Sequence, residues 1–127
     1  MSQRRYDSDN IFAKIIRGQL PCNKVYEDDL MLAFDDITKA APVHVLVVPK
    51  GEFVNFGDFA SNAGEKNVAH FFKKIKEIAE DLGLKESGYR LITNNGSGVS
   101  QTVPHFHVHI LGGKRLSGLL PRDKEKR

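Results

Sequence analysis

Three of the five histidines in this chain alternate with apolar residues, in the run Pro104-His105-Phe106-His107-Val108-His109-Ile110. Alternation with a period of two is the pattern of a β-strand, whose successive side chains point to opposite faces of a sheet. We therefore expect the three histidines to leave one face of a strand and the apolar residues to face a core. Because buried imidazoles need hydrogen-bond partners, such a row predicts a functional site.

A row of imidazoles on a strand has two chemical uses. Histidine is the commonest nitrogen ligand of Zn²⁺, so the row can bind a metal. A neutral imidazole is also a nucleophile toward phosphorus, and a second imidazole can hold or protonate oxygens during phosphoryl or nucleotidyl transfer. The spacing leaves metal binding and catalysis equally open, with a purely structural row of histidines as the less favoured alternative. Cys22 is the only cysteine, so a zinc site with thiolate ligands has little support.

The composition is that of one globular domain. We predict a single domain over residues 1–127, with its core at about 9–113 and a tail at 114–127. The single cysteine excludes an internal disulfide and predicts a cytoplasmic protein. We find no signal peptide, and the longest apolar run is too short to cross a membrane. Much of the net charge of +3 lies in the tail, which we interpret as a solvated end of the chain.

The periodicity along the chain predicts an α+β fold, with an antiparallel five-stranded sheet meander, one short helix and one long helix. Besides the histidine strand, strands are expected at residues 24–27, 31–34, 44–48 and 89–93. The continuous apolar run from Val45 to Val48 predicts a central strand that is buried on both faces.

Apolar residues at helical spacing predict helices over residues 11–16 and 65–82. The short helix has three candidate caps, which are Asp7, Ser8 and Asp9. For the long helix, Asn62 and Glu65 resemble a capping box, and Gly83 is a suitable stop.

Polar residues elsewhere in the chain suit a phosphate ester. The segment from Gly96 to Thr102 offers backbone N–H groups and small hydroxyls that can bind phosphate oxygens, although an ordinary hairpin loop has the same composition. Asp36 follows a predicted strand, where it can cap a turn or accept hydrogen bonds from a ribose diol. His44 lies on a different strand and can be a core histidine or part of the site.

The motif His105-Phe106-His107-Val108-His109, followed by Ile110 and Leu111, resembles the signature of the histidine triad family. The similarity covers about residues 9–113 and includes four further blocks at 10–16, 25–29, 32–37 and 41–50. Within the family, the chain is most similar to the small nucleoside phosphoramidases of the Hint type. The resemblance implies a homodimer in which two five-stranded sheets join into one continuous sheet of ten strands.

The resemblance also implies a role for each candidate residue. His107 would be the nucleophile that forms a nucleotidyl-imidazole intermediate, with His105 and His109 contacting the phosphate and assisting the leaving group. His44 would be the fourth histidine, and Asp36 would bind the ribose hydroxyls. The positions around the phosphate would be Asn94, Ser100 and Thr102. The base pocket would be lined by residues that the sequence alone assigns to the core, namely Phe12, Ile15, Phe34, Ile37 and Leu46.

The function that the resemblance implies is hydrolysis or transfer at the α-phosphate of purine nucleoside 5′-phosphoramidates or adenylated compounds. Two alternatives remain, a dinucleoside polyphosphate hydrolase and a metal- or nucleotide-binding interaction module without turnover. No cofactor or metal is required by this scheme. The implied partners are a purine nucleotide and a second copy of the chain, with no membrane and no nucleic acid. Tryptophan is absent from the chain, so the leaving group is left open.

Overall fold

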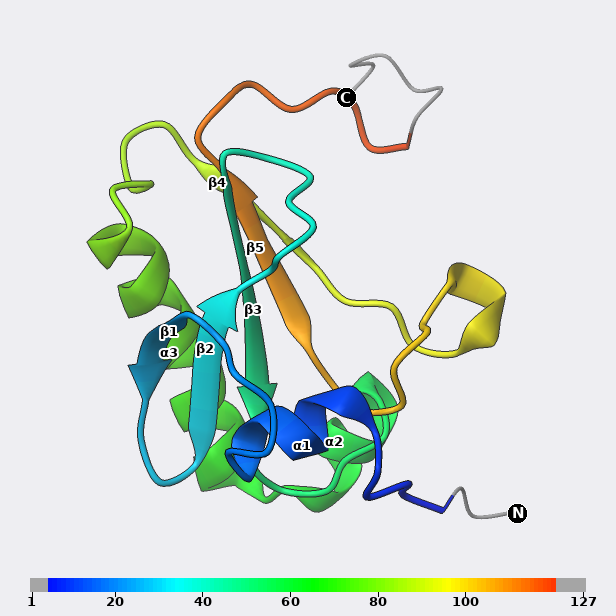
Figure 1. Ribbon diagram of the computed structural model, residues 1–127. Coiled ribbons are helices and arrows are strands. Elements are labelled where there is room, and N and C mark those ends of the chain that lie inside the picture. Colours follow the sequence, from blue (N-terminus) through cyan, green and yellow to red (C-terminus); the bar gives the residue numbers. More distant parts are fainter. Residues whose placement is uncertain (1–4, 121–127) are drawn as a thin grey trace.

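The computed structural model describes residues 5–120 as one sheet with helices packed on its two faces (Figure 1). Its elements are α1 (Ile11–Ile16), β1 (Lys24–Glu27), β2 (Met31–Asp35), β3 (Val43–Pro49), α2 (Phe56–Asn62), α3 (Glu65–Asp81), β4 (Tyr89–Ile92), a 3₁₀ turn (Ser97–Val99) and β5 (Val108–Gly112). The α+β class and the five-stranded sheet are confirmed. Of the predicted tail, residues 121–127 lie outside the described residues.

The strands lie in the order β1-β2-β3-β5-β4, and each neighbouring pair is antiparallel. Only the first three strands form the expected meander. After β3 the chain passes through α2 and α3 and returns at the edge of the sheet as β4, so β5 is inserted beside β3. This order makes β3 central, as predicted, and pairs Leu46 on β3 with His109 on β5.

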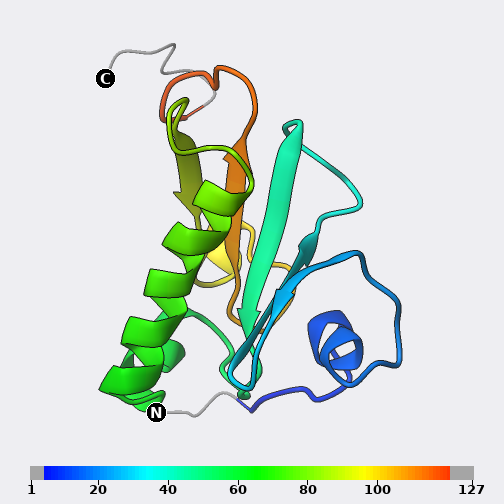
Figure 2. The same ribbon diagram turned by 90° about the vertical axis from the view of Figure 1, so that its left-hand side faces the viewer.

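The two faces of the sheet have separate cores. The long helix α3 covers one face and the short helix α1 lies over the other (Figure 2). Under α3, Phe106, Val108 and Ile110 pack with Phe71 and Ile75, which confirms that the apolar residues of the histidine motif face a core. The smaller cluster under α1 consists of Phe12, Leu32, Phe34, Leu46 and Val48. The histidine side of the sheet is therefore the side of α1.

The helix termini differ from the prediction. The cap of α1 is Asn10, whose Oδ1 accepts a hydrogen bond of 2.9 Å from the Ala13 N–H, instead of Asp7, Ser8 or Asp9. The predicted capping box of the long helix is wrong because Asn62 belongs to a second short helix, α2, which the sequence reading missed. The segment Phe56–Asn62 is only 7 residues long and buries only Phe59, so its apolar spacing covers too few turns to stand out in the sequence. Within residues 5–120, no helix has the length and apolar character needed to cross a membrane.

The histidine motif enters β5 later than expected. Pairing with β3 begins at Val108 and pairing with β4 begins at His109, so only His109 lies within the strand and His105 and His107 precede it. The reason is a hydrogen bond to a distant segment: the Phe106 N–H donates to the Phe53 carbonyl at 2.7 Å, which ties this part of the chain to the loop before α2. The first two histidines therefore lie outside the ladder, with His105 in a bend of the chain.

Candidate active site

A cavity of about 450 Å³ lies between α1 and the sheet. Most of the residues predicted for the site line it, and they are Phe12, Ile15, Phe34, Asp36, Ile37, Leu46, Thr102, His107 and His109. Sequence reasoning missed the other lining residues, Ile11, Leu20, Pro21, Cys22, Asp35 and Val103. Four predicted residues do not line the cavity, namely His44, His105, Asn94 and Ser100.

The apolar lining serves as core and cavity wall at once. Phe12, Phe34 and Leu46 are buried, and each is part of the cluster under α1. Ile37 differs, because it is 92% exposed at the edge of the cavity, and the assignment of this residue to the core is wrong. It lies two residues beyond Asp35, the last residue of β2.

The ring of His107 is held in one tautomer by the backbone. Its Nδ1 lies 2.7 Å from the carbonyl oxygen of His105. A carbonyl oxygen only accepts hydrogen bonds, so Nδ1 carries the proton and the lone pair is on Nε2. The ring of Phe12 packs edge to face against this imidazole with the centroids 4.9 Å apart. A buried imidazole with a free nitrogen lone pair therefore borders the cavity.

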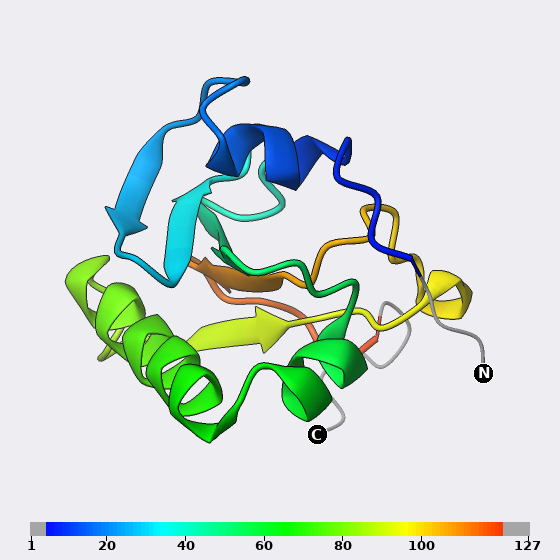
Figure 3. The same ribbon diagram turned by 90° about the horizontal axis from the view of Figure 1, so that it is seen from below.

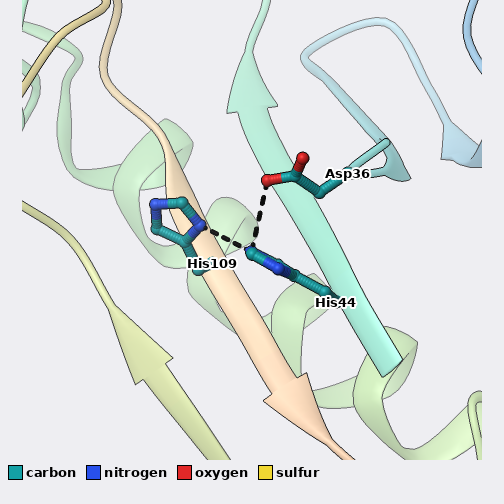
Figure 4. A group of neighbouring side chains, drawn as sticks. All are labelled: Asp36, His44 and His109. Atoms are coloured by element: carbon teal, nitrogen blue, oxygen red, sulfur yellow. Dashed lines mark hydrogen bonds and ion pairs between the residues drawn. The ribbon is translucent and has the colours of Figure 1, made fainter. Parts of the chain in front are cut away.

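His109 and His44 form a hydrogen-bonded pair across β5 and β3, with Asp36 beside it (Figure 4). Nε2 of His44 lies 2.9 Å from Nδ1 of His109 and 3.4 Å from Oδ2 of Asp36. The Ala40 N–H donates to Nδ1 of His44 at 3.0 Å, so the proton of His44 is on Nε2. His44 then donates to His109, whose own proton is left on Nε2 as a donor at the cavity. His44 thus acts on the site through His109.

His105 is enclosed and does not reach the cavity. It is fully buried, with Nε2 at 2.8 Å from the Pro49 carbonyl and Nδ1 at 2.5 Å from the hydroxyl of Tyr6. The phosphate contact of His105 stays a prediction, while its backbone carbonyl accepts from His107 and orients that ring. Nothing in the sequence around Tyr6 indicated its contact with the motif.

Burial keeps the histidines of the site neutral near pH 7. Loss of hydration lowers the pKa of His105 to about 4 and that of His109 to about 4. Burial also lowers the pKa of His107, and it lowers the pKa of His44 against the opposing influence of the Asp36 carboxylate. A neutral imidazole is the form that can attack phosphorus.

Among the described residues, Asp36, His44 and His109 could offer a metal ion one ligand atom each, and these atoms lie within 4.8 Å of one another. The hydrogen bonding opposes this use. A histidine that binds metal through Nε2 normally donates its Nδ1–H to a neighbour. Nδ1 of His44 instead accepts from the Ala40 N–H. The cluster therefore fits a relay of hydrogen bonds between neutral imidazoles better than a metal centre.

The loop before the histidine motif is fixed by Gln101. Its Oε1 accepts from the Gly96 N–H and its Nε2 donates to the Val54 carbonyl, each at 2.7 Å. Thr102 follows directly and lines the cavity, as predicted. Ser100 is exposed and has a left-handed backbone with φ of 69°. The loop therefore brings one of the three predicted phosphate-binding residues to the cavity.

The HIT domain model matches residues 17–116 of the chain. The protein belongs to the HIT family. An uncharacterized HIT-like protein of Rickettsia prowazekii is 51% identical over 115 residues, which are 91% of this chain and 96% of the relative. The solved structure of a HIT family hydrolase from Clostridium thermocellum is 43% identical, covers 88% of this chain and 96% of its own, and superposes with a TM-score of 0.80.

This HIT protein also resembles the histidine triad nucleotide-binding protein of Candida albicans, with a TM-score of 0.73 and 27% identity over 91% of this chain and 89% of the other. The family and its solved members support a hydrolase-type enzyme with a nucleotide-binding fold. The resemblance that the histidine motif suggested is thus confirmed at the level of the family.

Proposed function

We propose that this HIT protein hydrolyses purine nucleoside 5′-phosphoramidates or related adenylated compounds through a nucleotidyl-His107 intermediate. The observation that carries the proposal is the hydrogen bond from Nδ1 of His107 to the His105 carbonyl, which leaves the lone pair on Nε2 of a ring that lines the cavity. An anionic phosphate repels anionic nucleophiles, so a neutral imidazole suits attack at phosphorus.

The reaction proceeds in two displacements. In the first, the Nε2 lone pair of His107 forms a bond to the α-phosphorus, the P–N bond breaks, and the departing nitrogen takes its electron pair. That nitrogen needs one proton, which the His44–His109 pair delivers through Nε2 of His109. The pair is neutral in the free enzyme and takes up this proton from solvent as the substrate binds, because the anionic phosphate and the Asp36 carboxylate both favour it.

In the second displacement, water attacks phosphorus and the bond to His107 breaks. The proton that water releases returns to the His44–His109 pair, which restores the enzyme. The products are a nucleoside monophosphate and an amine, so each turnover consumes one water molecule.

The cavity supports a nucleoside as the bound part of the substrate. Its apolar wall, formed by Phe12, Phe34 and Leu46, suits a flat purine ring, and Asp36 at the same cavity can accept hydrogen bonds from a ribose diol.

We propose further that the protein is a cytoplasmic homodimer. The edge strand β4 exposes Tyr89, Leu91 and Ile92, and Phe72 on α3 is 37% exposed. An apolar edge strand of this kind is suited to pairing with a second copy, which would extend the sheet to ten strands. The single cysteine fits a reducing compartment.

The experiment that tests the function measures hydrolysis of adenosine 5′-phosphoramidates of lysine and of an aryl amine, in excess EDTA, for the wild type beside His107→Ala. We expect turnover by the wild type and a loss of at least about a thousandfold in kcat for the variant, with nucleotide binding still measurable. His70→Ala is the matched control, because His70 lies on α3 and contacts Asp28 instead of the cavity. Turnover that survives in His107→Ala would contradict the proposal.

The same assay distinguishes the alternatives. Hydrolysis of diadenosine polyphosphate in place of the phosphoramidates would indicate a dinucleoside polyphosphate hydrolase. Absence of turnover with both substrates, together with stoichiometric zinc in protein purified without a histidine tag, would indicate a metal-binding module.

A further inference from the structure

Tyr6 reaches the histidine motif from the far end of the chain. Its hydroxyl lies 2.5 Å from Nδ1 of His105 across a sequence separation of 99 residues, and the two rings meet edge to face with centroids 5.5 Å apart. Figure 3 shows the N-terminal segment before α1 running past the chain that leads into β5. A residue outside the motif therefore contacts its first histidine.

The direction of this hydrogen bond follows from the other partner of the ring. Nε2 of His105 lies 2.8 Å from the Pro49 carbonyl, which only accepts, so the proton of the neutral ring is on Nε2. Nδ1 must then accept, and the Tyr6 hydroxyl donates. Because His105 is 0% exposed, bulk water cannot replace the Tyr6 hydroxyl as the hydrogen-bond donor to Nδ1.

His105 also orients the nucleophile. The backbone carbonyl of His105 accepts the Nδ1–H of His107 at 2.7 Å, so any shift of residue 105 moves the His107 ring. Phe12 supports both rings by edge-to-face packing, with centroid distances of 6.3 Å to His105 and 4.9 Å to His107. Apolar packing alone leaves rotation and small translations open, whereas the two hydrogen bonds at the ring of His105 fix its position.

We propose that Tyr6 is a positioning residue, which fixes His105 by donating to its Nδ1 and thereby holds the carbonyl that orients the nucleophile His107. This positioning role rests on the proposed function, since it concerns how His107 attacks phosphorus. The hydroxyl of Tyr6 takes no part in bond making or breaking. Its effect falls on kcat, because small displacements of a reacting group slow the chemical step by up to about a hundredfold while substrate contacts elsewhere persist.

The test compares Tyr6→Phe with the wild type in the full-length protein. The variant keeps the aromatic ring and loses only the hydroxyl. We expect kcat for the adenosine 5′-phosphoramidate to fall about tenfold, with KM changed less than about twofold. We also expect the ¹⁵N resonance of His105 Nδ1 to move toward that of a nitrogen without a hydrogen bond, and the His107 Nδ1 resonance to change with it.

Tyr26→Phe is the matched control. Tyr26 also loses a hydroxyl hydrogen bond, of 2.7 Å to Oδ2 of Asp28, but it lies on β1 and does not line the cavity. Both variants should lower the melting temperature slightly, and only Tyr6→Phe should change kcat and the two imidazole resonances.

Three results would overturn the proposal: an unchanged kcat in Tyr6→Phe, an unchanged His105 Nδ1 resonance, or an equal loss of kcat in Tyr26→Phe. The resonances separate this proposal from the proposed function. If the wild type hydrolyses no phosphoramidate, the function is wrong, and the shift of His107 Nδ1 in Tyr6→Phe still decides whether Tyr6 positions that ring.

Discussion

Single hydrogen bonds decide the chemistry of the four histidines at the site. A carbonyl oxygen only accepts and a backbone N–H only donates, so one such partner fixes the position of the proton on a neutral imidazole. His107 has the His105 carbonyl as this partner, and His44 has the Ala40 N–H. The result is an unprotonated Nε2 on His107 next to a protonated Nε2 on His109, which is the pairing that a displacement at phosphorus requires.

Ser100 is the one residue other than glycine with a positive φ among the described residues. A left-handed backbone costs a residue with a Cβ about 1–2 kcal/mol. Glycine avoids this cost, but it loses more conformational entropy on folding, so the net gain is smaller. We expect Ser100→Gly to raise the free energy of unfolding by about 0.5–1 kcal/mol, measured by urea denaturation. Ser97→Gly in the same turn is the control and should lower it. A loss of stability in Ser100→Gly would contradict the claim that the backbone at Ser100 is strained.

At the scale of the elements, two short helices hold the site in place. α1 carries Phe12 to the cavity, and the loop before α2 anchors both Gln101 and the Phe106 N–H. Helices of 6 and 7 residues are too short to be stable alone, so caps and tertiary contacts must maintain them. Asn10 and Asn55 supply these caps, and both side chains are buried.

Asn10→Ala tests the role of the α1 cap. The change removes the hydrogen bond from the Ala13 N–H to Oδ1 and that from Nδ2 to the Asp7 carbonyl, at 2.9 and 2.8 Å. We expect a loss of about 1–2 kcal/mol in the free energy of unfolding, and a higher KM because Phe12 is less firmly held. Ser8→Ala is the control, since Ser8 was a predicted cap that the structure does not use. Equal effects of the two changes in chemical denaturation would contradict the assignment.

At the scale of the whole molecule, the buried neutral histidines link folding to pH. The unfolded chain protonates them near the ordinary pKa of 6.5, whereas the folded protein protonates His105 and His109 only at about 4. Between these values the unfolded state binds more protons, so stability rises with pH across this window and falls as the solution is acidified through it.

The expected result is a lower free energy of unfolding at pH 5 than at pH 7.5, by about 2 kcal/mol for His105 alone. Urea denaturation at a series of pH values measures it. Glu27 and Asp28, whose hydrogen-bonded carboxyls have a pKa lowered to about 2, respond mainly below this window. A stability that is constant from pH 7.5 to 5 would show that the histidines are not kept neutral by burial.

The sequence by itself determined the features that depend on local periodicity. The alternation in the histidine motif gave the core-facing side of Phe106, Val108 and Ile110, and the continuous run 45–48 gave a central buried strand. The long helix was predicted to within one residue, because its apolar stripe spans several turns. The family followed from the spacing of the motif and from blocks along most of the chain.

Only the tertiary structure decided which groups meet. His44 and His109 are separated by 65 residues, and Tyr6 and His105 by 99, so no local pattern can pair them. The insertion of β5 beside β3 brings the first pair together, and the path of the N-terminal segment brings the second. The proton on each ring depends on such distant partners, because a side chain's residue type sets what it can donate or accept, and its neighbours in space set what it does.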